Sequence, residues 1–213
     1  MKTDDLISML AQDAAPPAAA PLGARAVLGI AGGFAVAVAM YLAVLGPRPD
    51  LMRHVLEPLV MAKTLLPLAL APLALVLGLR AVRPAATPGR AARVIWAVPA
   101  VLAGLVVWAL LTTPRGDLWR DWLGHSIPVC LPAITVLSLP ILAGLIAALR
   151  RGAPVDPQAA GALAGLASAG LATALYSTFC TEDSPLFYAT WYTLGIVFTA
   201  GLGAWAGGRW LRW

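Results

Sequence analysis

The sequence predicts an all-α membrane protein: a polytopic bundle of six transmembrane helices preceded by a short amphipathic helix on the cytoplasmic side. Of its 213 residues, 60% are apolar and 12% are charged, whereas about one quarter of the residues of a soluble domain are charged. The mean hydropathy is +0.82. A membrane-spanning helix needs roughly 20 apolar residues, and six stretches of about that length follow one another between short polar breaks.

Residues 1–13 precede the apolar stretches, and their pattern predicts a short cytoplasmic helix. Thr3 can cap this helix, and Asp4 and Asp5 would lie in its first turn, where negative charge meets the positive end of the helix dipole. An apolar face recurs at helical spacing. Its members are Thr3, Leu6, Ile7 and Leu10. Because a helix of about three turns is marginal alone in water, we expect it to dock on a partner; the alternatives are that it lies flat on the membrane or frays.

Residues 14–25, which include AAPPAAAPL, are expected to form a linker, because prolines keep a chain extended. The six-helix transmembrane domain would then occupy residues 26–213. Its expected spans lie near residues 26–45, 58–79, 94–112, 127–149, 159–178 and 188–208.

The distribution of basic residues predicts the orientation. Lys and Arg accumulate in the cytoplasmic loops of membrane proteins. With the N-terminus inside, the cytoplasmic side receives Lys2, Arg25, Arg80, Arg83, Arg90, Arg93, Arg150, Arg151, Arg209 and Arg212. The outer side receives Arg48, Arg53, Lys63, Arg115 and Arg120. We therefore expect both termini in the cytoplasm.

Two cysteines lie at the outer ends of the fourth and fifth expected spans. Cys130 and Cys180 would face the same aqueous compartment, which in a bacterial inner membrane is the oxidising periplasm. They could form a disulfide or serve redox chemistry, or bind a soft metal with His125, Glu182 or Asp183 as a further ligand. They could also pack as small buried hydrophobes. The residues alone leave these alternatives open.

Two further features are expected on the outer side. Lys63 lies inside the second span, where a charge is costly and suggests function; we expect its long side chain to snorkel outward, toward Glu57 or an acid of an outer loop. The loop of residues 115–125 has apolar residues spaced for a short amphipathic helix, which could cover the cysteines or simply lie on the membrane. Those residues are Leu118, Trp119, Trp122 and Leu123.

Glycines spaced four residues apart predict close packing of helices, because small faces let helix backbones approach each other. The pairs are Gly29 with Gly33, Gly161 with Gly165, and Gly203 with Gly207. We expect them to pack the bundle against itself, and a homo-oligomer built on the same faces is the alternative.

The sequence contains no nucleotide-binding loop, no H-E-x-x-H and no serine–histidine–aspartate set that would indicate an enzyme. The spans also lack the buried acids of a pump or proton-coupled transporter. We therefore expect neither catalysis nor a cofactor. The net charge of +5 is explained by membrane topology, so no direct contact with nucleic acid is expected; the partners would be the lipid bilayer and a protein.

The start MKTDDLI, the Ala/Pro linker, the six spans and the two outward cysteines together resemble the NrsF (negative regulator of sigma F) family. The resemblance covers essentially the whole chain and implies a bacterial inner-membrane anti-sigma factor for an extracytoplasmic-function (ECF) sigma factor. It implies that the sigma factor is contacted by Lys2, Thr3, Asp4, Asp5, Leu6 and Ile7. Because Leu10 shares the apolar face, we expect it to fill the same groove on the partner. It also implies that Cys130 and Cys180 sense a periplasmic stress such as a heavy metal or an oxidant.

Two other functions compete with this interpretation. A membrane thiol–disulfide redox protein would use the same cysteines, but its usual C-x-x-C motif is absent. A small membrane transporter would fit the span count, but the lack of buried charge in the spans counts against it.

Overall fold

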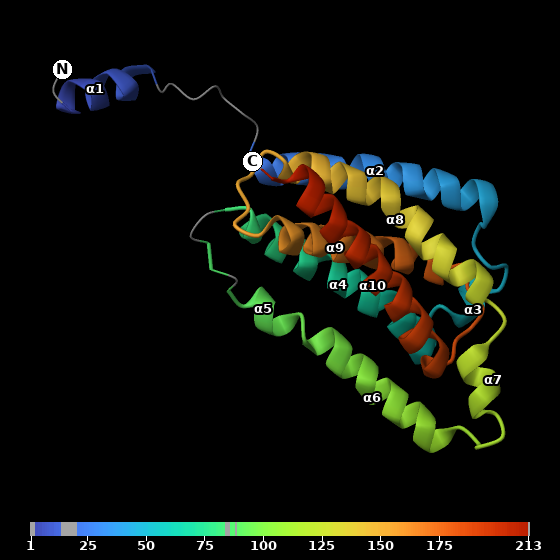
Figure 1. The fold of residues 1–213 in the computed structure, drawn as a ribbon. Coiled ribbons are helices and arrows are strands. Elements are labelled where there is room, and N and C mark those ends of the chain that lie inside the picture. The colour runs from blue at the N-terminus through green and yellow to red at the C-terminus, as the bar shows by residue number, and fades with distance from the viewer. Residues whose placement is uncertain (1–2, 14–20, 84–85, 88, 213) are drawn as a thin grey trace.

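A computed structural model describes residues 3–13, 21–83, 86–87 and 89–212, and for residues 10–13 it describes the backbone alone. This part of the chain forms ten helices and no strand (Figure 1). The helices are α1 (Thr3–Asp13), α2 (Leu22–Val44), α3 (Leu51–His54), α4 (Pro58–Ala81), α5 (Ala91–Val94), α6 (Ala97–Thr112), α7 (Leu118–Leu123), α8 (Ile127–Leu149), α9 (Pro157–Ser177) and α10 (Pro185–Trp210). Lys2 and residues 14–20 of the expected linker lie outside the described residues.

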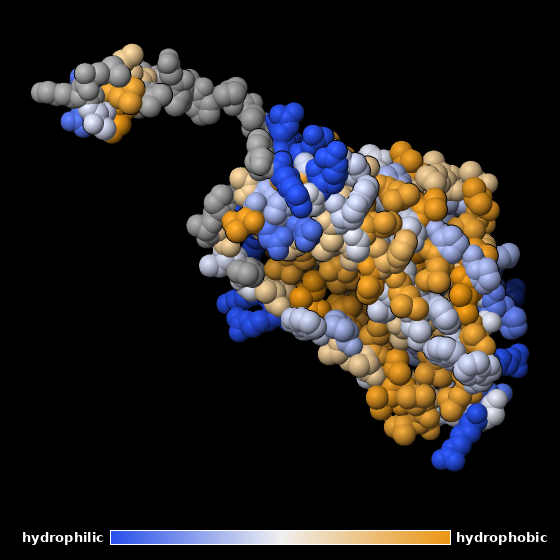
Figure 2. All heavy atoms as spheres, viewed as in Figure 1, coloured by the Kyte–Doolittle hydropathy of each residue, from blue (hydrophilic) through white to orange (hydrophobic). Residues whose placement is uncertain are grey.

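Six helical segments are long and apolar enough to cross a membrane, which confirms the predicted fold class. The first two are α2 and α4, the third is α5 continued by α6, the fourth is α8 together with the preceding α7, and the last two are α9 and α10. Hydrophobic residues cover the middle of the bundle and hydrophilic residues gather toward its two ends (Figure 2). The largest shift from expectation is at the first span: α2 begins at Leu22 rather than near residue 26, so Arg25 belongs to its first turn.

Helix α9 occupies the centre of the bundle. It packs against α10, α4 and α8, while α2 packs mainly on α8. Most of α9 is alanine, glycine and serine, and 67% of its most apolar window is buried, which is more than in any other span. Small side chains allow the neighbouring backbones to come close on several sides at once. Helix α6 lies at the edge of the bundle (Figure 1), and Ala109 is its one buried residue.

Glycine pairs bring helix backbones into direct contact. A Cβ atom added to Gly161 in α9 would overlap the carbonyl oxygen of Gly203 in α10, and a Cβ at Gly203 would overlap that of Gly161. Gly29 in α2 and Gly144 in α8 oppose each other in the same way. The predicted packing of the bundle against itself is therefore confirmed, whereas a homo-oligomer stays a prediction.

Replacing Gly161 with alanine is expected to destabilise the bundle, because the new methyl group meets backbone rather than a movable side chain. Overpacking of this kind costs about 1–3 kcal/mol. The matched control is Gly201→Ala on α10, where an added Cβ meets nothing within 4 Å. Thermal unfolding of the full chain in detergent measures the difference. Equal midpoints for the two variants would contradict the proposed role of the glycine contact.

Candidate functional site

The loop between α9 and α10, residues 178–184, carries Cys180 and is held by a buried lysine. Lys63, on α4, is 1% exposed although it lies in an apolar helix. Its Nζ donates to the carbonyl oxygen of Cys180 at 2.6 Å and contacts the carboxylate of Asp183. The expectation that Lys63 reaches an acid of a loop is confirmed, while the side of the membrane on which this loop lies stays a prediction. Glu57 is not among the partners of Lys63, and its carboxylate makes a 2.7 Å hydrogen bond with His54.

A second buried cation reaches the same carboxylate. Nη1 of Arg48 donates to the two carboxylate oxygens of Asp183, at 3.2 and 3.0 Å. The backbone N–H of Arg48 donates to the carbonyl of Thr178 at 3.0 Å, and Tyr41 shares a 2.6 Å hydrogen bond with the Thr178 hydroxyl. Arg48, Lys63 and Asp183 together form what we call the outer charge cluster, after the end of the bundle that is predicted to face outward. It fastens the Cys180 loop to the end of α2 and to α4.

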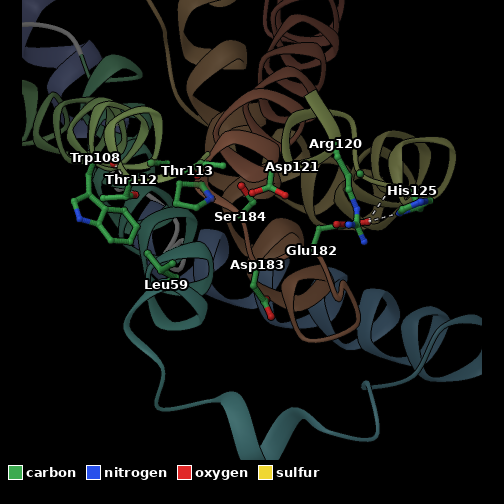
Figure 3. Close-up of a pocket in the computed structure, with 13 residues that line it drawn as sticks. Leu59, Trp108, Thr112, Thr113, Arg120, Asp121, His125, Glu182, Asp183 and Ser184 are labelled. Carbon is green, nitrogen blue, oxygen red and sulfur yellow. Dashed lines mark hydrogen bonds and ion pairs between the residues drawn. The ribbon is translucent and has the colours of Figure 1, made fainter. Parts of the chain in front are cut away.

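Glu182 connects the same loop to the start of α8. Its Oε1 accepts the backbone N–H of His125 at 2.8 Å and the hydroxyl of Ser126 at 3.4 Å. Figure 3 shows Glu182 beside His125 at one side of a pocket of about 580 Å³. Since Cys130 lies in the first turn of α8, Glu182 ties together the two chain segments that carry the cysteines.

Helix α7 confirms the short helix predicted within residues 115–125. It is fixed to α10 by two hydrogen bonds rather than simply lying on the membrane. Nε1 of Trp122 donates to Oγ1 of Thr190 at 3.1 Å, and Nε1 of Trp191 donates to the carbonyl of Trp122 at 2.8 Å. The helix therefore forms one wall of the outer pocket, to which it contributes Arg120 and Asp121.

Cys130 and Cys180 are both free thiols, and both are buried, at 0% and 1% exposure. They belong to one apolar cluster that also contains Tyr176, Tyr192 and Phe187. The structure thus brings together the two cysteines that the sequence placed on the same side. Bulk solvent reaches neither of them in this conformation, so a reagent or signal acting on either thiol requires local opening.

The structure does not bring His125 to the cysteines as a third ligand. Its imidazole is 86% exposed and lies 3.8 Å from the Glu182 carboxylate. Among the residues that the structure describes, no three His, Cys, Asp or Glu side chains lie together as a metal site would require. The part of the site that sequence reasoning missed is Arg48. Its signal was weak, because an arginine in an outer loop is ordinarily solvated.

The predicted N-terminal helix is present as α1, which stands clear of the six spans (Figure 1). It begins at Thr3, so Thr3 is its first helical residue rather than its cap. Asp4 and Asp5 lie in the first turn, as expected. Leu6 and Ile7 are 43% and 59% exposed. Leu10 lies in the helix, but its side chain is outside the described residues. The apolar face is open to a partner.

Known proteins match this sequence over essentially its whole length. Residues 10–213 match the family model NrsF, described as negative regulator of sigma F. The chain is 37% identical to the anti-sigma-F factor NrsF of Caulobacter vibrioides and 34% identical to the probable anti-sigma-F factor NrsF of Azospira oryzae, in each case over 100% of both chains. No solved structure matches it.

The match to the family model begins at residue 10, so the first turns of α1 are compared only through the two relatives. The six spans and both cysteines lie within the matched region. Full-length identity above 30% to two relatives and a match to the family model over most of the sequence lead to one conclusion. The chain belongs to the NrsF family of negative regulators of sigma F.

Proposed function

We propose that this protein is a membrane anti-sigma factor that holds an ECF sigma factor through α1 and releases it when the outer end of the bundle senses a stress. The observation that carries the proposal is the membership of the chain in a family of sigma-factor regulators. Regulation by binding requires no catalytic group, which fits the apolar composition of the spans.

Helix α1 is suited to capture by its exposed face. Leu6, Ile7 and Met9 are between 43% and 61% exposed and offer apolar anchors for a groove on the partner. Asp4 and Asp5 would complement the basic surface that a sigma factor uses for nucleic acid. Capture by α1 would keep the sigma factor at the membrane and cover part of that surface. The protein itself would contact no nucleic acid.

The proposed orientation places α1 in the cytoplasm and the cysteines at the periplasmic side of a bacterial inner membrane. The support is the excess of basic residues on the side of the bundle where the chain enters α2. The N-terminus of α2 and the C-terminus of α10 lie at the same end (Figure 1). With this orientation, a signal received near Cys130 and Cys180 has to cross the bilayer.

The proposed input is a change in the state of the two thiols. Because both are buried, the change would begin with release of the Cys180 loop from the outer charge cluster. Helix α9 begins at the opposite end of the bundle and leads directly into this loop, and it packs on α10, α4 and α8. Movement of α9 is therefore the proposed route by which the outer end alters access to α1.

Co-purification tests the proposed function. The full chain, tagged at its C-terminus, is extracted from membranes with mild detergent, and bound proteins are identified by mass spectrometry. We expect an ECF sigma factor in about equal amount to the tagged chain. A tagged six-span membrane protein of another family serves as the control. Recovery of no sigma factor, or of equal amounts with the control, would reject the proposal.

Replacing both cysteines with serine is expected to leave sigma-factor capture intact and to remove the response to metals and oxidants. A serine hydroxyl retains the size of the thiol but neither its redox chemistry nor its affinity for soft metals. Transcription of a sigma-dependent reporter, measured with and without cadmium or diamide, reports both properties. An unchanged induction in the Cys130→Ser, Cys180→Ser double variant would show that the sensor lies elsewhere.

A further inference from the structure

A basic pocket lies at the end of the bundle opposite the cysteines, between the last residues of α8 and α10. It has a volume of about 520 Å³ and is lined by Arg150 and Arg151 from one side and by Trp210 and Arg212 from the other. In the described part of the chain none of the three guanidinium groups has a hydrogen-bond or ion-pair partner. Three cations converge on this pocket, and the described residues supply no counter-charge to them.

An apolar groove continues directly from this pocket. The groove has a volume of about 450 Å³ and runs between α8 and α10. Ala147, Arg150 and Trp210 line both the pocket and the groove, so the two form one continuous depression. Leu139 and Trp205 line the groove and are 46% and 65% exposed, which means that it is open to its surroundings.

The surroundings of the groove are the hydrocarbon of the bilayer, since α8 and α10 are spans. The pocket lies where those spans end, at the level of the lipid headgroups. Trp205 and Trp210, with ring centroids 5.6 Å apart, mark that level, because tryptophan gathers at the membrane interface. A ligand that fills both parts needs an anionic head and an apolar chain.

We infer that this depression binds one anionic phospholipid of the bilayer. Arg150, Arg151 and Arg212 would hold the phosphate, which guanidinium groups bind with two parallel hydrogen bonds, and an acyl chain would lie in the groove between α8 and α10. An acidic soluble protein fits less well, because the groove lies among membrane-spanning residues that such a protein does not reach. Free phosphate would leave the groove unused. The inference does not depend on the function proposed above.

The test titrates the full chain in detergent with phosphatidylglycerol and reads bound lipid by native mass spectrometry. We expect the triple variant R150Q/R151Q/R212Q to bind at least tenfold more weakly, because each basic residue near an anionic headgroup contributes about a fivefold attraction. The matched control is R53Q/R115Q/R120Q, which removes three arginines from the other end of the bundle. It is expected to bind as the unaltered chain does.

Two further arms separate a lipid from a simple anion. Ala143→Trp fills the groove at an exposed position of α8 and leaves the three arginines unchanged, and it is expected to weaken phosphatidylglycerol binding at least tenfold. Glycerol phosphate, the headgroup without chains, is expected not to compete, and phosphatidylcholine is expected to bind at least tenfold more weakly. Equal binding of the two lipids, full competition by glycerol phosphate, or unchanged binding by the triple variant would each overturn the inference.

Discussion

Replacing Leu6 and Ile7 together with aspartate is expected to abolish capture of the sigma factor. Both side chains are exposed in the free protein, at 43% and 59%, and would be buried against the partner. Burial of one such side chain contributes about 1.5–3 kcal/mol. Loss of both, with two charges added to the contact, would weaken binding by at least about 100-fold. Binding of purified sigma factor to the full chain in nanodiscs measures the change.

The control for this variant adds the same charge to the opposite face of α1. Ser8 and Gln12 are one helical turn apart, at positions on the side of α1 opposite Leu6 and Ile7. The S8D/Q12D double variant therefore tests whether charge alone weakens binding. We expect it to bind within about threefold of the unaltered chain. If both double variants lose binding equally, or if L6D/I7D keeps it, the apolar face of α1 is not the docking surface.

Replacing Asp183 with alanine is expected to cause the second large effect. Lys63 and Arg48 would remain buried without their shared carboxylate, since the side chains of the two cations are 0% and 2% exposed. Leaving the buried Lys63 charge unpaired costs on the order of 3 kcal/mol, whereas Arg48 keeps the Asp50 carboxylate at 3.5 Å. The Cys180 loop would also lose its ion pair with α4 and would be held there only through its backbone, because Nζ of Lys63 still donates to the Cys180 carbonyl.

Two measurements check this prediction on the full chain in detergent. Thermal unfolding is expected at a lower temperature for D183A, and the thiols are expected to react with a maleimide at least tenfold faster, since local opening limits access to them. Asp117→Ala is the matched control, because this carboxylate lies on the same side of the bundle and is exposed. Unchanged labelling by D183A would mean that the outer charge cluster does not guard the cysteines.

The composition and periodicity of the sequence were sufficient for the fold class. Six apolar stretches of the length of a span became six spans, since the bilayer requires every backbone group to be satisfied within the segment. The face of Thr3, Leu6 and Ile7 became one side of α1, because helical spacing alone sets which residues share a face. The orientation and the residues that contact the sigma factor remain predictions.

The sites at the two ends of the bundle depended on contacts between segments distant in sequence. The pairing of Lys63 with Asp183 joins residues 120 positions apart, and the pairing of Arg48 with Asp183 joins residues 135 positions apart. The sequence placed Lys63 in a span, and the cost of a charge there required a partner. The identity of the acid that pairs with Lys63 depends on where the α9–α10 loop contacts α4. The packing of the helices determines that contact.

For the cysteines, too, the sequence predicted one part and the tertiary structure decided the other. Their positions at two span ends placed them on one side of the membrane, and the physical reason is the fixed length of a span. Only the packing of α8 against α9 and α10 put both thiols in one buried cluster as free cysteines. The sequence by itself thus determined the spans and the shape of α1, whose causes are local. The tertiary structure decided the outer charge cluster and the burial of the thiols, because these depend on which helix backbones the small residues allow to touch.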